Sequence, residues 1–192
     1  MIRGRGLLWA GLLLGVGLGG PVLAKEAKPA KPAVTSLSVT NNEETFYLSF
    51  EAVHAFLPEI TERVDSGLEV TFTYLIKVKR RRSFWLDAGV LTRVIKTTVL
   101  FDGLTRQYAL SRTLNGSLLE ETTTSDRGEV ERWMTRVERL PLFKRSEYPD
   151  RSKMFVKVKA EIMSGFVLLF IPWDTDTKWQ KIELGGSQEP AQ

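Results

Sequence analysis

Side chains that commonly perform catalysis are scarce in this chain of 192 residues. His54 is the only histidine and there is no cysteine, so one chain cannot build a metal site from several histidines or cysteines, and it has no thiol nucleophile. A serine triad would have to use His54, and no Gly-x-Ser-x-Gly elbow is present. We therefore expect no catalytic, cofactor-binding or metal-binding residues, and we interpret the protein as a non-enzyme.

Paired carboxylates offer the remaining route to chemistry. Asp174 and Asp176 are close in sequence, but two carboxylates without further oxygen ligands make a poor cation site. Glu120 and Glu121 are neighbours in a predicted strand, so their side chains point to opposite faces and cannot act as an acid/base pair. A carbohydrate- or peptidoglycan-interacting protein that uses carboxylates and tryptophans stays open as the alternative function. As an enzyme it would need two carboxylates about 5 to 10 Å apart in a cleft.

Basic residues beside aromatic residues are better candidates, and they suggest binding. Lys79 to Arg82 are four consecutive basic residues, followed by the aromatic pair Phe84 and Trp85. This cluster could bind a polyanion or a lipid headgroup. The structural alternative is a clasp, in which an arginine turns inward and pairs with Asp87 to pin the strand end to the following turn.

Two segments near the C-terminus also combine apolar, aromatic and basic residues. Phe166 to Trp173, FVLLFIPW, is a continuous apolar run that is typical of a strand buried on both faces. The alternative is an exposed loop that makes a peripheral membrane contact or binds a protein partner. Trp179, with Lys178 and Lys181, forms an aromatic and basic edge that could stack on a sugar or a peptide. The candidate contact residues are therefore Arg80, Arg82, Trp85, Phe170, Trp173 and Trp179.

The N-terminal segment has the pattern of a secretion signal. Arg3 and Arg5 precede a 14-residue apolar stretch, residues 7–20, which is short for a membrane span. Val22-Leu23-Ala24 then places small residues where a signal peptidase reads them. We expect cleavage after Ala24 and a periplasmic or secreted protein, with a retained N-terminal anchor as the alternative.

The charge of the predicted folded part is balanced. Of 27 basic and 23 acidic residues, five basic and one acidic residue lie in residues 1–33, so the remainder has no net charge. A neutral exported domain argues against nucleic-acid binding. We divide the chain into a signal peptide (1–24), a Pro/Ala/Lys linker (25–33), a single β-rich globular domain (34–184) and a flexible tail (185–192).

Alternation of apolar and polar residues predicts a largely antiparallel β structure. The segment Leu68 to Asp87 organises the chain, because its apolar residues fall on every second position as in a long half-buried strand. Asp102-Gly103 and Asn115-Gly116 predict two-residue hairpins. Further strands are predicted over residues 34–41, 45–50, 90–101, 104–114, 117–124, 153–161 and 178–184.

Two segments have helical patterns. Pro58 to Ser66 predicts a helix that Gly67 ends, and Asp126 predicts the N-cap of a second helix. The apolar spacing of the second helix runs as far as Val137 and predicts that it ends at Pro141, followed by a loop to Asp150. We predict an α+β, predominantly β fold: a curved antiparallel sheet of about six to eight strands with two helices packed on one side.

A set of residues in these elements carries a family resemblance: Ser66-Gly67-Leu68, Phe72, Tyr74, Arg80, Arg82, Trp85, Asp87 and the block Leu100 to Tyr108. Through these residues the chain resembles the bacterial domain-of-unknown-function family 4390. That resemblance covers most of residues 36–140. The family is uncharacterised, so the resemblance implies an exported β-rich domain without implying a chemistry. Its members are often encoded beside membrane sensor kinases, which implies an accessory role toward a membrane or periplasmic partner.

Overall fold

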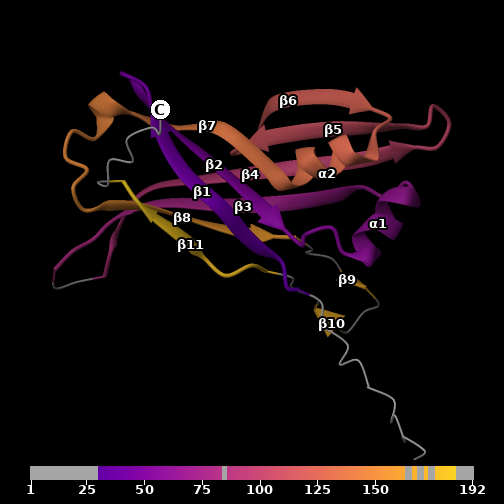
Figure 1. Cartoon of the computed structure of the whole chain (residues 1–192), viewed down its shortest axis with the longest axis horizontal. Coiled ribbons are helices and arrows are strands. Elements are labelled where there is room, and N and C mark those ends of the chain that lie inside the picture. The colour runs from indigo at the N-terminus through magenta and orange to yellow at the C-terminus, as the bar shows by residue number, and fades with distance from the viewer. Residues whose placement is uncertain (1–29, 84–85, 163–165, 168–170, 173–175, 185–192) are drawn as a thin grey trace, which may run out of the picture.

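Strand β3 (Val70–Arg80) lies at the centre of the larger of the two main antiparallel sheets in the described residues (Figure 1). The computed structural model describes residues 30–83, 86–162, 166–167, 171–172 and 176–184. The larger sheet has six strands in the order β11-β8-β3-β4-β5-β6. Its other strands are β4 (Ala88–Asp102), β5 (Gln107–Leu114), β6 (Ser117–Thr124), β8 (Met154–Glu161) and β11 (Gln180–Glu183).

The predicted alternation of β3 is confirmed. Its even-numbered residues from Val70 to Val78 are all buried, whereas the odd-numbered residues between them keep part of their surface in solvent. A strand has a period of two, so this pattern gives the six-stranded sheet an inner face in the core and an outer face toward solvent.

A smaller sheet covers the inner face. It contains β1 (Ala33–Asn41), β2 (Thr45–Val53) and β7 (Arg136–Lys144), in the order β1-β2-β7. Figure 1 shows its strands crossing those of the larger sheet at an angle. The rings of Phe50 on β2 and Tyr74 on β3 meet edge to face at 5.0 Å between centroids, so the core lies between the two sheets.

Both helices lie on this inner face beside the smaller sheet (Figure 1), which confirms the predicted fold class with the strands divided between two sheets. Helix α1 (Pro58–Asp65) buries Ile60 and Val64, and Gly67 follows it with a positive φ of 73°. Helix α2 (Arg127–Thr135) begins at Asp126, whose carboxylate accepts a hydrogen bond from Gly128 N–H. Among the described residues, neither helix is long and apolar enough to cross a membrane.

The prediction that α2 continues to Pro141 is wrong. The helix ends at Thr135, and the next residues form β7, which pairs with β2. A bulge explains the misleading spacing: Leu140 pairs with Leu48 and Val137 with Phe50, and Arg139 between them has a φ of 50°. The extra residue separates buried positions of the strand by three, which imitates a helix. The predicted loop after it contains the short 3-10 helix η1 (Arg145–Glu147).

Two turn predictions have different outcomes. Asn115 and Gly116 both have positive φ, at 51° and 87°, so the predicted tight hairpin between β5 and β6 is confirmed. The two-residue turn at Asp102-Gly103 is wrong, because Asp102 pairs with Gln107 across a longer loop. Asp102 instead accepts hydrogen bonds from Leu104 N–H and from the Thr105 hydroxyl, both at 2.8 Å, and these bonds lower its pKa.

The apolar run Phe166 to Trp173 does not form one continuous buried strand. Its described parts are β9 (Phe166–Val167) and β10 (Ile171–Pro172), which pair antiparallel with each other as a short hairpin. The two described parts of the run therefore point in opposite directions. The predicted contact residues Phe170 and Trp173 lie outside the described residues.

The end of α2 is capped by side chains from the larger sheet. The Tyr74 hydroxyl donates to Met134 O at 2.6 Å, and the Thr97 hydroxyl donates to the same oxygen at 3.2 Å. Both hydroxyls come from neighbouring strands, β3 and β4. They satisfy a carbonyl that a helix end would otherwise leave unpaired in the core. Burial raises the pKa of the Tyr74 phenol far above its ordinary value.

We predict that Tyr74→Phe lowers the free energy of unfolding by about 1 kcal/mol, since it removes one of two donors to a buried carbonyl. Urea unfolding followed by far-UV circular dichroism measures the change. Tyr47→Phe is the matched control, because within the described part of the chain the Tyr47 oxygen accepts a single exposed hydrogen bond, from Asn42 at 3.4 Å, and we expect almost no change. Equal effects of the two substitutions would contradict the capping role of Tyr74.

Candidate functional site

Lysines gather on the outer face of the larger sheet. Lys77 on β3 stands directly opposite Lys157 on β8, and Lys157 stands directly opposite Lys181 on β11. Lys79 is the next outward residue of β3. The tryptophan just before β11 lies among these side chains. We call this group the lysine face; it consists of Lys77, Lys79, Lys157, Lys181 and Trp179.

Trp179 is the aromatic platform of the lysine face. The Nζ atom of Lys157 lies 4.3 Å from the centroid of the indole ring, and that of Lys77 lies 5.3 Å from it. Both distances are within the range of cation–π attraction. The residue keeps 37% of its surface exposed, so a molecule in solution can still reach it. Lys181 covers a second aromatic ring, that of Phe155, at 4.2 Å.

Acidic partners are unevenly distributed over this face. Glu183 forms ion pairs with Lys181 at 2.9 Å and with Arg81 at 2.6 Å, and the hydrogen bond from Lys181 is the main reason that its pKa is lowered. Lys159, the next outward residue of β8 after Lys157, pairs with Asp176 and with Glu161. Within the described residues, no ion pair includes Lys77, Lys79 or Lys157.

The pKa values of Lys157 and Lys159, two outward lysines on β8, shift in opposite directions. Partial burial lowers the pKa of Lys157, and the nearby charges of Lys79 and Lys77 lower it further, against a smaller opposing effect of Asp87. A hydrogen bond to Asp176 is the main cause that raises the pKa of Lys159. Like charges directly opposite each other on paired strands destabilise a sheet. The charge on Lys157 is therefore held in the folded protein against a net penalty.

The basic run Lys79 to Arg82 spans the end of β3 and the residues directly after it. Arg80 donates to Asp150 O at 3.1 Å, and Arg81 reaches Glu183 on β11, so both tie the end of β3 to distant segments. The predicted pairing of an arginine with Asp87 is not among the described contacts, so the clasp uses other partners. Arg82 is exposed. Trp85 lies outside the described residues.

Sequence reasoning identified Trp179 and Lys181 but missed Lys77 and Lys157. It grouped Trp179 with Lys178, whereas the described cation–π contacts of the indole come from Lys77 and Lys157. Both lysines occupy outward positions of alternating strands, and this was visible in the sequence. The register that sets them opposite each other joins strands far apart in the chain, and no local pattern reveals such a register.

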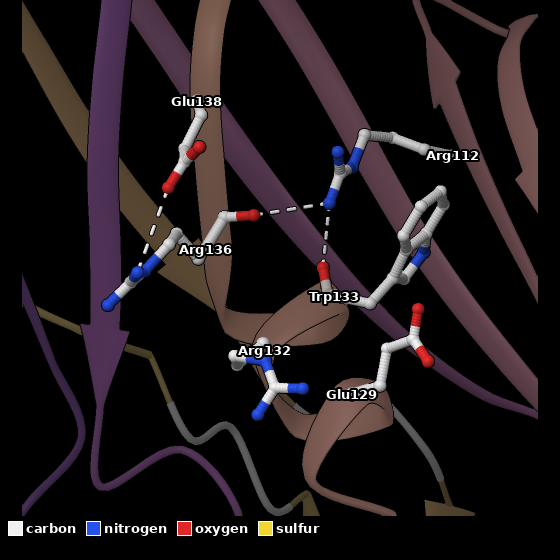
Figure 2. Close-up of a pocket in the computed structure, with 6 residues that line it drawn as sticks. All are labelled: Arg112, Glu129, Arg132, Trp133, Arg136 and Glu138. Carbon is white, nitrogen blue, oxygen red and sulfur yellow. Dashed lines mark hydrogen bonds and ion pairs between the residues drawn. The ribbon is translucent and has the colours of Figure 1, made fainter. Parts of the chain in front are cut away.

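A second candidate is a pocket of about 250 Å³ between α2 and β7, shown in Figure 2. Its central group is the guanidinium of Arg112, a residue that is only 8% exposed. Arg112 donates to Trp133 O at 2.7 Å and to Arg136 O at 3.1 Å, stacks on the Trp133 ring, and forms an ion pair with Glu120. The pocket is lined by Arg112, Glu129, Arg132, Trp133, Arg136 and Glu138.

The pocket of Figure 2 does not bring its two carboxylates together. Glu129 accepts a hydrogen bond from the Thr124 hydroxyl at 2.6 Å, and Glu138 pairs with Arg136 at 3.7 Å. Figure 2 shows the two acids on opposite sides of the Trp133 backbone. This arrangement lacks the facing carboxylates that a glycoside hydrolase needs. We interpret the pocket as a structural site in which Arg112 completes the cap of α2.

The described residues contain no group of three or more histidine, cysteine or acidic side chains that could hold a metal ion. His54 lies exposed just after β2, with a φ of 54°. Asp176, one of the two acids considered for a cation site, pairs with Lys159, while Asp174 lies outside the described residues.

We predict that Arg112→Met lowers the free energy of unfolding by about 2 to 4 kcal/mol, because it leaves two partly buried carbonyl groups and Glu120 without the buried guanidinium that pairs with them. Arg127→Met is the matched control, since its ion pair with Asp65 is about half exposed on both sides and should contribute less than about 1 kcal/mol. Urea unfolding measures both. If the two substitutions have the same effect, Arg112 does not cap the helix.

We predict that Lys157→Met raises the free energy of unfolding at neutral pH by a few tenths of a kcal/mol. The folded pKa of Lys157 is lowered, so its charge opposes folding at neutral pH, and that penalty disappears as the pH rises through the folded pKa toward 10.5. The advantage of the variant should therefore shrink in alkaline urea titrations.

Lys159→Met provides the opposite case on the same strand. The folded pKa of Lys159 is raised, so its charge adds stability that is fully present below 10.5 and is lost as the pH rises through the folded pKa. We expect this variant to be less stable than the wild type at neutral pH. A loss of stability in both variants would show that the charge of Lys157 is compensated after all.

Comparison with known families gives a clear assignment. The family model described as Domain of unknown function (DUF4390) matches residues 30–183. Neither the comparison with curated proteins nor that with solved structures gave a match. The matched region contains both sheets, both helices and the whole lysine face. The chain belongs to the DUF4390 family of domains of unknown function.

Proposed function

We propose that this protein is a non-enzymatic binding or accessory module of the cell envelope, and that the lysine face contacts its partner. The observation that carries the proposal is the row of Lys77, Lys157 and Lys181 around an exposed tryptophan. Two of these lysines and Lys79 have no acidic partner in the described part of the chain. Such a surface favours a negatively charged partner.

Export is part of this proposal. The basic start, the short apolar stretch and the small residues before position 25 support a cleaved signal peptide and a periplasmic or secreted location. A retained N-terminal anchor would place the same domain at a membrane surface. The resemblance to the DUF4390 family supports a membrane sensor kinase as one candidate partner, and this protein would then be its accessory.

A binding role accounts for the chain better than catalysis does. The sequence offers one histidine and no cysteine. The carboxylates of the α2–β7 pocket are engaged by Thr124 and Arg136 and lie apart from each other. The alternative function as a carbohydrate- or peptidoglycan-acting protein therefore lacks its required pair of carboxylates at that pocket.

A photo-crosslinking amino acid at position 179, introduced in the native host, tests the proposal. We expect a discrete adduct with an envelope component, identified by mass spectrometry, because Trp179 is exposed at the centre of the lysine face. Combining the probe with Lys77→Gln and Lys157→Gln should strongly reduce the adduct, since those substitutions remove the charges nearest to position 179.

The same probe at Leu104 is the matched control. That residue is 96% exposed in the loop between β4 and β5, outside the lysine face, and it should give no such adduct. Fractionation of the same cells places the protein in the periplasm, the membrane or the medium. Equal adducts from positions 104 and 179, or a protein confined to the cytoplasm, would refute the proposed function.

A further inference from the structure

We infer that the lysine face is a binding site for a phosphate-bearing ligand, with Lys77, Lys79 and Lys157 as its cationic groups and Trp179 as its floor. This inference rests on the proposed function and specifies the chemistry of the partner. It is carried by the register of three strands and by the distribution of acids around them.

The spacing of the three cations suits a compact, multiply charged anion. Lys77 and Lys157 stand opposite each other on neighbouring strands, which lie about 4.8 Å apart in a sheet. Lys79 follows on the same face, roughly 7 Å along β3. A phosphomonoester has a charge of about −1.5 to −2 and three acceptor oxygens, so one group can bind more than one of these lysines. A carboxylate has one charge and two oxygens.

Among the residues that the structure describes, no acidic side chain forms an ion pair with Lys77, Lys79 or Lys157. Glu183 is already shared between Lys181 and Arg81, so it does not neutralise the centre of the face. Asp87 is the other acid that acts on Lys157, and its effect is smaller than those of the neighbouring lysines. The indole of Trp179 lies against two of the ammonium groups and limits water on that side, which strengthens their attraction for an anion.

A purely structural role does not explain this arrangement. Outward lysines often protect the edge of a sheet from pairing with other chains. However, β3 and β8 are internal strands that are paired on both sides, so Lys77 and Lys157 protect no edge. Lys96 on β4 shows the ordinary case, because it faces outward between two threonines, Thr73 and Thr113.

The test uses the full-length chain, expressed with its own N-terminal segment and purified as the cell leaves it. One arm titrates inorganic pyrophosphate by isothermal calorimetry. The other measures co-sedimentation with phosphatidylcholine vesicles that do or do not contain phosphatidate. Binding in the first arm identifies a soluble phosphate compound as the source of the ligand, and binding only to phosphatidate vesicles identifies a lipid headgroup.

We expect the double substitution Lys77→Gln and Lys157→Gln to weaken the binding observed by about tenfold or more. Lys96→Gln, on the same face of the sheet, should bind as the wild type does. The double variant should unfold at the same urea concentration as the wild type or a higher one, so its loss of binding cannot be attributed to misfolding.

Three results would overturn the inference. The first is that neither probe binds at millimolar concentration, and the second is that the double variant binds as tightly as the wild type. The third is that polyglutamate binds as tightly as the phosphate probes, which would make an acidic protein segment the ligand. An adduct from position 179 without phosphate binding would leave the proposed function standing and refute this inference alone. Phosphate binding without any adduct would refute the proposed contact with an envelope partner and leave the phosphate-binding site standing.

Discussion

The C-terminal end of α2 is held by three side chains from adjacent strands of the larger sheet. Tyr74 on β3 and Thr97 on β4 donate to Met134 O, and Arg112 on β5 donates to Trp133 O and Arg136 O. A helix end leaves carbonyl groups unpaired, and in a core they must find donors. Because β7 begins directly after α2, this cap also fixes where β7, an edge strand of the smaller sheet, begins. These hydrogen bonds therefore tie the start of β7 in the smaller sheet to β3, β4 and β5 of the larger one.

A buried arginine is tolerated in this cap because its charge is well matched. Arg112 has two carbonyl acceptors, an ion pair with Glu120 and an aromatic ring beneath it. Its Nε atom, and the Nε1 atom of Trp133, are buried without a hydrogen-bond partner among the described residues. Two buried nitrogen atoms of this site therefore lack a hydrogen bond, while its other polar groups are paired, and we interpret the site as structural. It also explains why a pocket rich in charged groups need not be catalytic.

The same sheet that builds the core on one face creates the lysine face on the other. Each strand places its apolar residues inward, so polar residues of β3, β8 and β11 must share the outer face. The predicted folded part has equal numbers of basic and acidic residues, yet its charges are not mixed evenly. Several of the acids pair with arginines elsewhere, such as Asp65 with Arg127 and Glu51 with Arg136. A neutral domain can therefore present a strongly positive patch to a partner.

The sequence alone determined the fold class, the inner and outer faces of β3, the limits of α1, the start of α2 and the tight turn at Asn115-Gly116, because each follows from local periodicity or backbone preference. Only the tertiary structure decided that residues 136–144 form a strand, since a bulge at Arg139 depends on pairing with β2. The lysine face is also a tertiary result. Lys77, Lys157 and Trp179 meet through strand pairing between distant segments, and the register of such pairing is set by packing of the whole core.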